Sequence, residues 1–125
     1  MKTLLLTIIT GFLLFLSPES KVQWLSPATH DFGEVIYKKN IEHQFHFKNT
    51  SSEAFVIDNV RTSCGCTAAD WQETPILPDS SASIQVVYDA NELGYFRKSI
   101  RVYFSGQRKA EKLYLEGTVV ETGSK

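Results

Sequence analysis

Hydrophobic and polar residues alternate along most of the chain after residue 21, which is the period of a β-strand with one buried face. The clearest run covers residues 41–48, where every second residue belongs to the predicted inner face: Ile41, His43, Phe45 and Phe47. Further runs with strand character occupy residues 31–35, 54–60, 84–88, 100–104 and 113–119. The pattern predicts strands throughout and no helix after the first twenty residues.

Turn-forming segments separate these runs at intervals of roughly 8–12 residues. Residues 49–53 (Asn-Thr-Ser-Ser-Glu) and 105–107 (Ser-Gly-Gln) are typical examples. About seven short strands with this spacing predict an all-β, immunoglobulin-like antiparallel β-sandwich. We place this single domain at residues 29–120, after a linker at 21–28 and before a polar tail at 121–125.

The first twenty residues have the pattern of an export signal. Lys2 precedes an apolar stretch at residues 4–16, and the segment 17–20 (Ser-Pro-Glu-Ser) ends it. The stretch is shorter than the ~20 residues that a membrane-spanning helix needs. Residues 1–20 are therefore predicted to be a signal peptide or an uncleaved signal anchor. The chain is expected in the periplasm or cell envelope, and at a membrane only if the signal is uncleaved.

Charge and motifs narrow the function classes. The chain of 125 residues has 13 basic and 14 acidic residues, a balance that argues against a nucleic-acid partner. Basic residues do gather between 97 and 112, and we interpret them as a solvated outer face. Motifs for a nucleophile elbow, a phosphate loop, a zinc protease or an EF-hand are not found. The sequence predicts a non-enzymatic protein.

Cys64-Gly65-Cys66 is the one chemically pointed motif, and four interpretations stay open. The first is a disulfide between the two cysteines. Residues i and i+2 of an extended strand lie ~6.5–7 Å apart, near the upper limit for a bridge, so Gly65 would have to bend the chain. So small a ring adds little stability and would suit a redox element.

The second interpretation is a soft-metal site for Cu(I) or Zn, which paired thiolates suit. A further ligand is needed, and His43 has inner-face parity. If consecutive strands run antiparallel, the start of its strand and the end of the next meet at one pole, where Cys64 and Cys66 follow. The third interpretation is pairing with thiols of a partner protein. The fourth is inert packing under a loop, with Gly65 forming a bulge. Trp71 is predicted to cover the core beside this motif.

The chain resembles an exported bacterial family, the domain of unknown function numbered 1573. The resemblance rests on residues 30–35, 42–50, 63–67, 71, 75–78 and 84–89, above all on Ser63-Cys64-Gly65-Cys66-Thr67 and the downstream Pro75-Ile76-Leu77-Pro78. It implies an immunoglobulin-like sandwich, similar to cilium-associated and major-sperm-protein-like modules, and it implies no reaction. Asp79 stands where the family usually has glycine. Asp tolerates left-handed turn geometry, so we expect the fold to accept it.

Together these features predict a protein-binding or structural module of the cell envelope that needs no cofactor. The alternative is a thiol-based redox or copper- or zinc-handling protein that uses Cys64 and Cys66.

Overall fold

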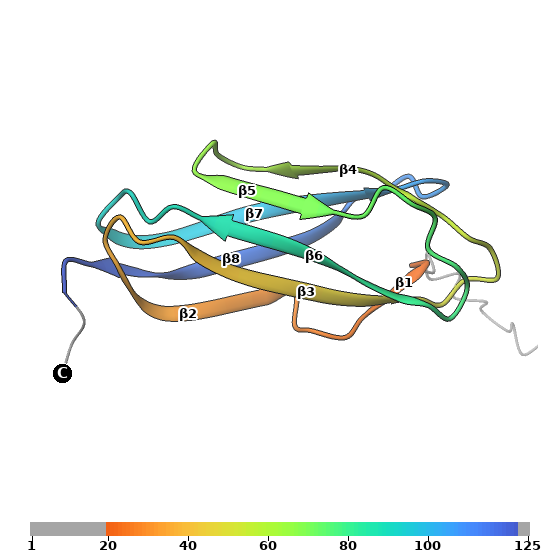
Figure 1. The fold of residues 1–125 in the computed structure, drawn as a ribbon, viewed down its shortest axis with the longest axis horizontal. Helices are drawn as coiled ribbons and strands as arrows, with labels where there is room; N and C mark the ends of the chain where they lie inside the picture. Colours follow the sequence, from red (N-terminus) through yellow and green to blue (C-terminus); the bar gives the residue numbers. More distant parts are fainter. Residues whose placement is uncertain (1–19, 123–125) are drawn as a thin grey trace, which may run out of the picture.

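The computed structural model of the chain describes residues 20–122. Within this range the chain forms eight β-strands and no helix, arranged as two four-stranded sheets that pack face to face (Figure 1). The strands are β1 (Val22–Trp24), β2 (Thr29–Ile36), β3 (Ile41–Asn49), β4 (Ile57–Thr62), β5 (Thr67–Trp71), β6 (Ser81–Tyr88), β7 (Gly94–Phe104) and β8 (Glu111–Val120). The predicted all-β sandwich is confirmed. The predicted signal segment lies outside the described residues, apart from Ser20.

The strand order is that of an immunoglobulin-like sandwich. One sheet has the order β1-β3-β6-β5 and the other has β2-β8-β7-β4. The first sheet corresponds to strands A-B-E-D of a constant-type immunoglobulin domain, and β4, β7 and β8 correspond to C, F and G. Strand β2 joins the second sheet beside β8 in a parallel pair, whereas the other neighbours are antiparallel.

The core follows the predicted alternation. In β3, Phe45 and Phe47 are fully buried while Glu42, Gln44 and His46 face solvent. Strand β6 of the same sheet and strands β7 and β8 of the facing sheet contribute residues of the same period. They are Ile84, Val86 and Tyr88 from β6, Ile100, Val102 and Phe104 from β7, and Leu113 and Leu115 from β8. Each such side chain stabilises the fold by about 1.5–3 kcal/mol when it leaves water.

Two strands lie where the sequence pattern indicated none. Strand β1 falls inside the segment 21–28 that we assigned to a linker; it pairs with β3, and Val22 is buried. Strand β5 falls in the stretch after Cys66 that showed no clear alternation, and it pairs with β6. The described sandwich therefore begins at Val22, and the chain passes from the first sheet to the second between β1 and β2.

A close approach between β2 and β8 explains why residue 117 is a glycine. The register of this pair shifts between Asp31 and Glu34, and Gly33 in the bulge has a left-handed φ of 67°. A Cβ atom on Gly117 of β8 would lie 2.8 Å from the carbonyl oxygen of Gly33 and 2.9 Å from Cζ of Phe96. Only glycine fits at position 117 without movement of its neighbours.

A buried asparagine ties the end of β3 to two loops. Asn49 is fully buried, and its amide nitrogen donates to the carbonyl oxygens of Glu53 and Ile76, each at 2.9 Å. Its side-chain oxygen accepts hydrogen bonds from the backbone N–H and the hydroxyl of Ser51. Its carbonyl oxygen accepts from the N–H of Asp79, whose φ of 65° is the left-handed geometry expected where the resembled family has glycine.

Candidate functional site at the Cys64–Cys66 turn and the adjoining basic face

The Cys64–Cys66 turn carries the chain from one sheet to the other. It joins β4, an edge strand of the second sheet, to β5, an edge strand of the first. The N–H of Ser63 donates to the carbonyl oxygen of Ser99 in β7 (2.9 Å), and the N–H of Ser99 donates to the Ser63 hydroxyl (3.0 Å). The carbonyl oxygen of Cys66 accepts from the N–H of Asp89, which follows β6. The turn is thereby attached to both sheets.

The two sulfur atoms are bonded to each other in this structure. The carbonyl oxygen of Cys64 accepts from the N–H of Thr67 (3.3 Å), which closes a tight turn and brings the Cα atoms of Cys64 and Cys66 to 5.3 Å. That separation is within the usual range for a disulfide. Gly65 has no left-handed φ, and a Cβ atom placed on it would meet nothing within 4 Å. The bend therefore comes from the turn and does not require glycine.

The surroundings of the two sulfurs differ. Both cysteines are half-buried, and Cys66 packs against the hydrophobic core. The backbone N–H of Cys66 lies 3.3 Å from Sγ of Cys64, to which it donates. The hydroxyl of Thr67, a residue only 5% exposed, lies 3.8 Å from each sulfur. The hydroxyl of Thr62 reaches the carbonyl oxygens of Cys64 and Thr67, each at 3.0 Å. Donors and acceptors inside the turn thus hold the sulfurs in place.

The structure does not bring His43 to the cysteines. His43 has the inner-face position expected on β3, but its ring stacks on that of His30, with centroids 3.7 Å apart. Strand β6 lies between β3 and β5, and Val86 of β6 pairs with both His43 and Ala69. The expected proximity required β4 to lie beside β3, whereas β4 lies in the other sheet.

A Cu(I) or Zn centre made of Cys64, Cys66 and His43 does not fit this arrangement. Residues 20–122 contain no group of three or more His, Cys, Asp or Glu side chains placed to hold a metal ion. Nε2 of His43 is buried without a hydrogen-bond partner, and this burial lowers the pKa of His43, with smaller contributions from the charges of His30 and His46.

Trp71 ends β5 and is half-buried against the core. It pairs with Ile84 of β6 at the edge of the first sheet. Trp71 therefore covers the core at the end of β5 that is remote from the Cys64–Cys66 turn, which adjoins Thr67.

A row of three cations crosses the outer face of the second sheet. Arg61 of β4 pairs with Arg101 of β7, and Arg101 pairs with Lys112 of β8. Like charges directly opposite on neighbouring strands repel one another. Among the described residues none of the three forms an ion pair; Arg61 lies over the ring of Tyr103, 5.9 Å from its centroid.

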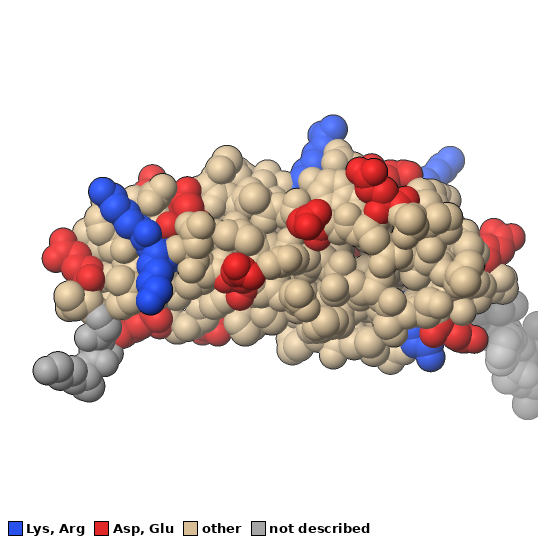
Figure 2. Space-filling view, viewed as in Figure 1, with Lys and Arg blue, Asp and Glu red and all other residues tan. Residues whose placement is uncertain are grey.

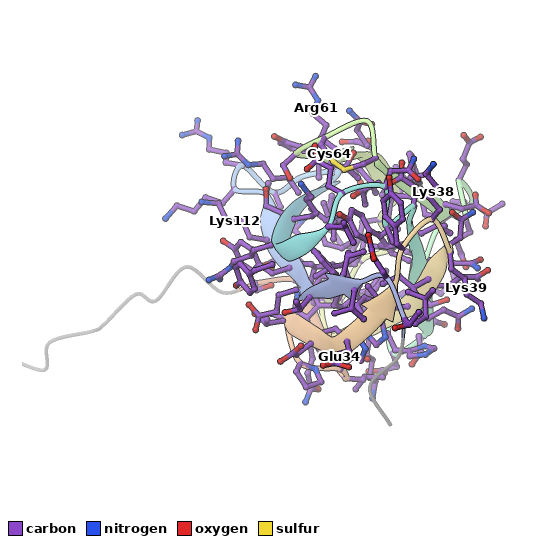
Figure 3. The ribbon with its side chains drawn as sticks, turned by 90° about the vertical axis from the view of Figure 1, so that its left-hand side faces the viewer. Glu34, Lys38, Lys39, Arg61, Cys64 and Lys112 are labelled. Carbon is purple, nitrogen blue, oxygen red and sulfur yellow. A yellow bond between two sulfur atoms is a disulfide. The ribbon has the colours of Figure 1, made fainter. Side chains whose placement is uncertain are left out.

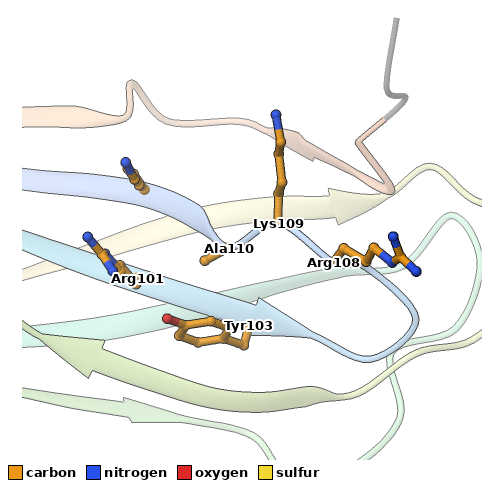
Figure 4. Close-up of a pocket in the computed structure, with 6 residues that line it drawn as sticks. Arg101, Tyr103, Arg108, Lys109 and Ala110 are labelled. Carbon is orange, nitrogen blue, oxygen red and sulfur yellow. The ribbon is translucent and has the colours of Figure 1, made fainter. Parts of the chain in front are cut away.

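Two open hollows adjoin this row. One, of about 460 Å³, is shown in Figure 4, and the other measures about 260 Å³. They share Arg101 and Tyr103. The first is lined by Arg101, Tyr103, Arg108, Lys109, Ala110 and Lys112, and the second by Arg61, Thr62, Ser63, Ser99, Arg101 and Tyr103. Neither lining includes a carboxylate. We call the surface formed by Arg61, Arg101, Lys112, Tyr103, Arg108 and Lys109 the basic face.

The opposite face of the molecule has a different distribution of charge. Figure 2 shows that face, with β3 and β6 in front, and there Lys and Arg are scattered among acidic and uncharged side chains. The cations between 97 and 112 form a visible cluster in the sequence, whereas Arg61 lies far from them along the chain. Strand pairing brings Arg61 into the row, and it places Arg97 elsewhere, over the ring of Tyr114. The second hollow ends at Ser63, so the basic face reaches the corner that holds Cys64 (Figure 3).

Solved structures with the same fold come from human and bacterial proteins with different descriptions. The chain superposes on the ASH/PapD-like domain 7 of human CEP192 with a TM-score of 0.69 at 8% identity, covering 86% of this chain and 90% of that one. A protein of unknown function from Porphyromonas gingivalis W83 gives 0.66 at 14% identity, over 78% of this chain and 46% of that one. The Vibrio cholerae VesB protease gives 0.62 at 11% identity, over 78% and 32%. The chain thus spans less than half the length of these two bacterial proteins.

No curated protein matches the sequence. Along residues 20–122 the structure has no helix long and apolar enough to cross a membrane. Residues 24–119 match the family described as a protein of unknown function, DUF1573. This match spans the two sheets and the Cys64–Cys66 turn, so the chain belongs to the DUF1573 family.

Proposed function

We propose that this chain is a non-enzymatic module of the cell envelope that binds an acidic protein through its basic face. The observation that carries the proposal is the row of Arg61, Arg101 and Lys112, which have no acidic partner in the described part of the chain. A sheet that places like charges opposite one another gives up stability. An anionic partner recovers it by neutralising the row. Binding on such a face requires neither a cofactor nor a reaction.

The residues of this face favour a protein as the partner. Arg and Tyr are enriched among the side chains that dominate protein–protein interfaces, and Arg61, Arg101 and Tyr103 adjoin one another here. Strand β4 is also an edge strand, so the cationic row ends at the rim of the sheet, where a partner can approach it from the side. The predicted signal at residues 1–20 supports a location in the periplasm or envelope.

Photo-crosslinking tests the proposal. A photoreactive phenylalanine at position 103, in the cells that naturally produce the chain, should give one discrete adduct with an acidic protein. The double variant Arg61→Glu, Arg101→Glu should weaken this adduct at least about tenfold, because both cations then repel the partner. The matched control Lys39→Glu, Lys48→Glu makes the same change in net charge away from the face and should leave the adduct intact.

An equal loss in both double variants would show that net charge, and not the basic face, controls binding. A purified protein that bound only an anionic glycan or anionic lipid vesicles would replace the protein partner with that ligand. Either result would refute the proposal as stated.

A second candidate function is thiol–disulfide exchange at Cys64 and Cys66. The observation that favours it is the position of the bonded sulfurs: they lie half-buried in a turn at the edge of the sandwich, with hydrogen-bond donors at hand. Exposed bridges in small rings are the ones that thiols open readily. The native mass of the purified protein, before and after alkylation without reductant, tests whether the pair is oxidised in the cell.

A further inference from the structure

The two sulfurs of the turn are not equivalent. Sγ of Cys64 accepts a hydrogen bond from the N–H of Cys66, whereas Cys66 packs against the hydrophobic core. A backbone N–H donor favours the ionised form of a sulfur, and apolar surroundings disfavour it. When the bridge is reduced, Cys64 is therefore the better placed of the two to be a thiolate.

The surface hollow next to Cys64 is lined by cationic side chains. The hollow of about 260 Å³ is lined by Ser63, which directly precedes Cys64, and by Arg61 and Arg101. A molecule that occupies this hollow lies against the residue preceding Cys64. Cys66 packs against the hydrophobic core, and its carbonyl oxygen accepts from the N–H of Asp89. A negatively charged partner held in the hollow therefore meets Cys64 first.

We propose that Cys64 is the sulfur through which this protein exchanges disulfides with an anionic partner, and that Cys66 resolves the mixed disulfide. This inference rests on the second candidate function above. In the forward direction, the Cys64 thiolate attacks one sulfur of the partner's disulfide. The bond from Cys64 to that sulfur forms, the partner's S–S bond breaks, and the partner's other sulfur leaves as a thiolate.

Cys66 then loses its proton to solvent and attacks Sγ of Cys64. The Cys64–Cys66 bond forms, and the partner's first sulfur leaves as a second thiolate. The partner's disulfide has gained an electron pair and the Cys64–Cys66 dithiol has lost one, so the exchange needs no further oxidant. In reverse, an anionic dithiol reduces the bridge by attacking Cys64. Thr67, whose hydroxyl lies 3.8 Å from each sulfur, is a positioning residue that donates to whichever sulfur carries the charge.

Single-cysteine variants test the assignment. Cys66→Ser leaves Cys64, and Cys64→Ser leaves Cys66. Each is mixed with anionic glutathione disulfide at neutral pH, and the adduct is followed by intact mass. We expect Cys64 to form the adduct about tenfold faster, since it has the donor and the cationic hollow. Unchanged tryptophan fluorescence confirms that both variants are folded. Equal rates, or a faster Cys66, would overturn the assignment.

The charge preference has its own measurement. The Cys66→Ser protein should react faster with anionic glutathione disulfide than with cationic cystamine at low salt, and added salt should remove the difference. Adding Arg61→Glu and Arg101→Glu should reverse the preference, whereas adding Lys39→Glu and Lys48→Glu should not. A preference unaffected by the first pair would overturn the role of the hollow.

The exchange function itself is tested separately on the intact pair. The oxidised protein is mixed with an acidic peptide that carries two reduced cysteines. We expect the peptide to become oxidised as the bridge opens. Lack of exchange here would overturn the second candidate function and the inference with it, whereas equal rates at the two single cysteines would overturn only the assignment of Cys64.

Discussion

The Cys64–Cys66 bridge should contribute only a small part of the stability of this domain. The ring that it closes contains Cys64, Gly65 and Cys66 alone. Constraining so short a loop in the unfolded chain is worth about 1.6 kcal/mol at 25 °C in the chain-entropy description. Domains are stable by about 5–15 kcal/mol. The double variant Cys64→Ser, Cys66→Ser should therefore remain folded.

The structure gives a second reason for this expectation. The hydrogen bonds between Ser63 and Ser99, and the bond from the N–H of Asp89 to the carbonyl oxygen of Cys66, use backbone and hydroxyl groups that do not depend on the sulfurs. The turn keeps its attachment to both sheets when the bridge is absent. The loss should remain close to the entropic value.

Urea unfolding followed by tryptophan fluorescence measures the difference in free energy of unfolding. The double variant should lose about 1.6 kcal/mol, and its melting temperature should fall by roughly 6–13 °C. The wild-type protein in the presence of a reductant is the matched control and should coincide with the variant. A loss above about 4 kcal/mol, or unfolding on reduction, would refute the reasoning. The bridge would then be a structural staple that cannot open while the domain stays folded.

Four further substitutions test other parts of the structure by unfolding measurements. Gly117→Ala should cost about 1–3 kcal/mol, because the new Cβ would lie 2.8 Å from the carbonyl oxygen of Gly33; Gly65→Ala, which meets nothing, should change stability by less than about 0.5 kcal/mol. Asn49→Ala should cost about 3 kcal/mol, since it leaves buried carbonyl groups without their donor. The lowered pKa of His43 means that the unfolded chain binds its proton first, so stability should fall as the pH drops through 6.5 toward the folded pKa; His43→Leu should flatten that part of the profile.

The sequence predicts the buried face of the long strands because a half-buried strand repeats every two residues. Phe45 and Phe47 show this, since both are fully buried on the face that alternation assigned to them. The sequence pattern does not predict strand β5, because its sequence, Thr-Ala-Ala-Asp-Trp, has weak strand propensity and a faint alternation. It is a strand because β6 offers a partner, and pairing between distant segments is not encoded in a local pattern.

The residues of the candidate site likewise differ in how far the sequence predicts their positions. Cys64 and Cys66 are visible as a motif, because two residues this close can meet through a local turn whatever the rest of the chain does. The predicted proximity of His43 to the cysteines, in contrast, required β3 and β4 to be neighbours. Its inner-face position is as expected, but β3 and β4 belong to different sheets, and its ring stacks on that of His30 instead. Parity depends on one strand, whereas proximity depends on the whole topology.

The bonded cysteines and the basic face have a common origin in the path of β4. Because β4 is the last strand of its sheet, Arg61 has a neighbour on one side only and extends the cationic row to the rim. Because the chain leaves that rim for the other sheet, the turn with Cys64 lies at the same corner (Figure 3). A substitution at Arg61 therefore separates the two candidate functions. If the face only binds, Arg61→Glu should weaken the binding of a protein partner equally in the oxidised and the reduced state of the bridge. If the face delivers an anionic disulfide, Arg61→Glu should also lower the rate of disulfide exchange at Cys64.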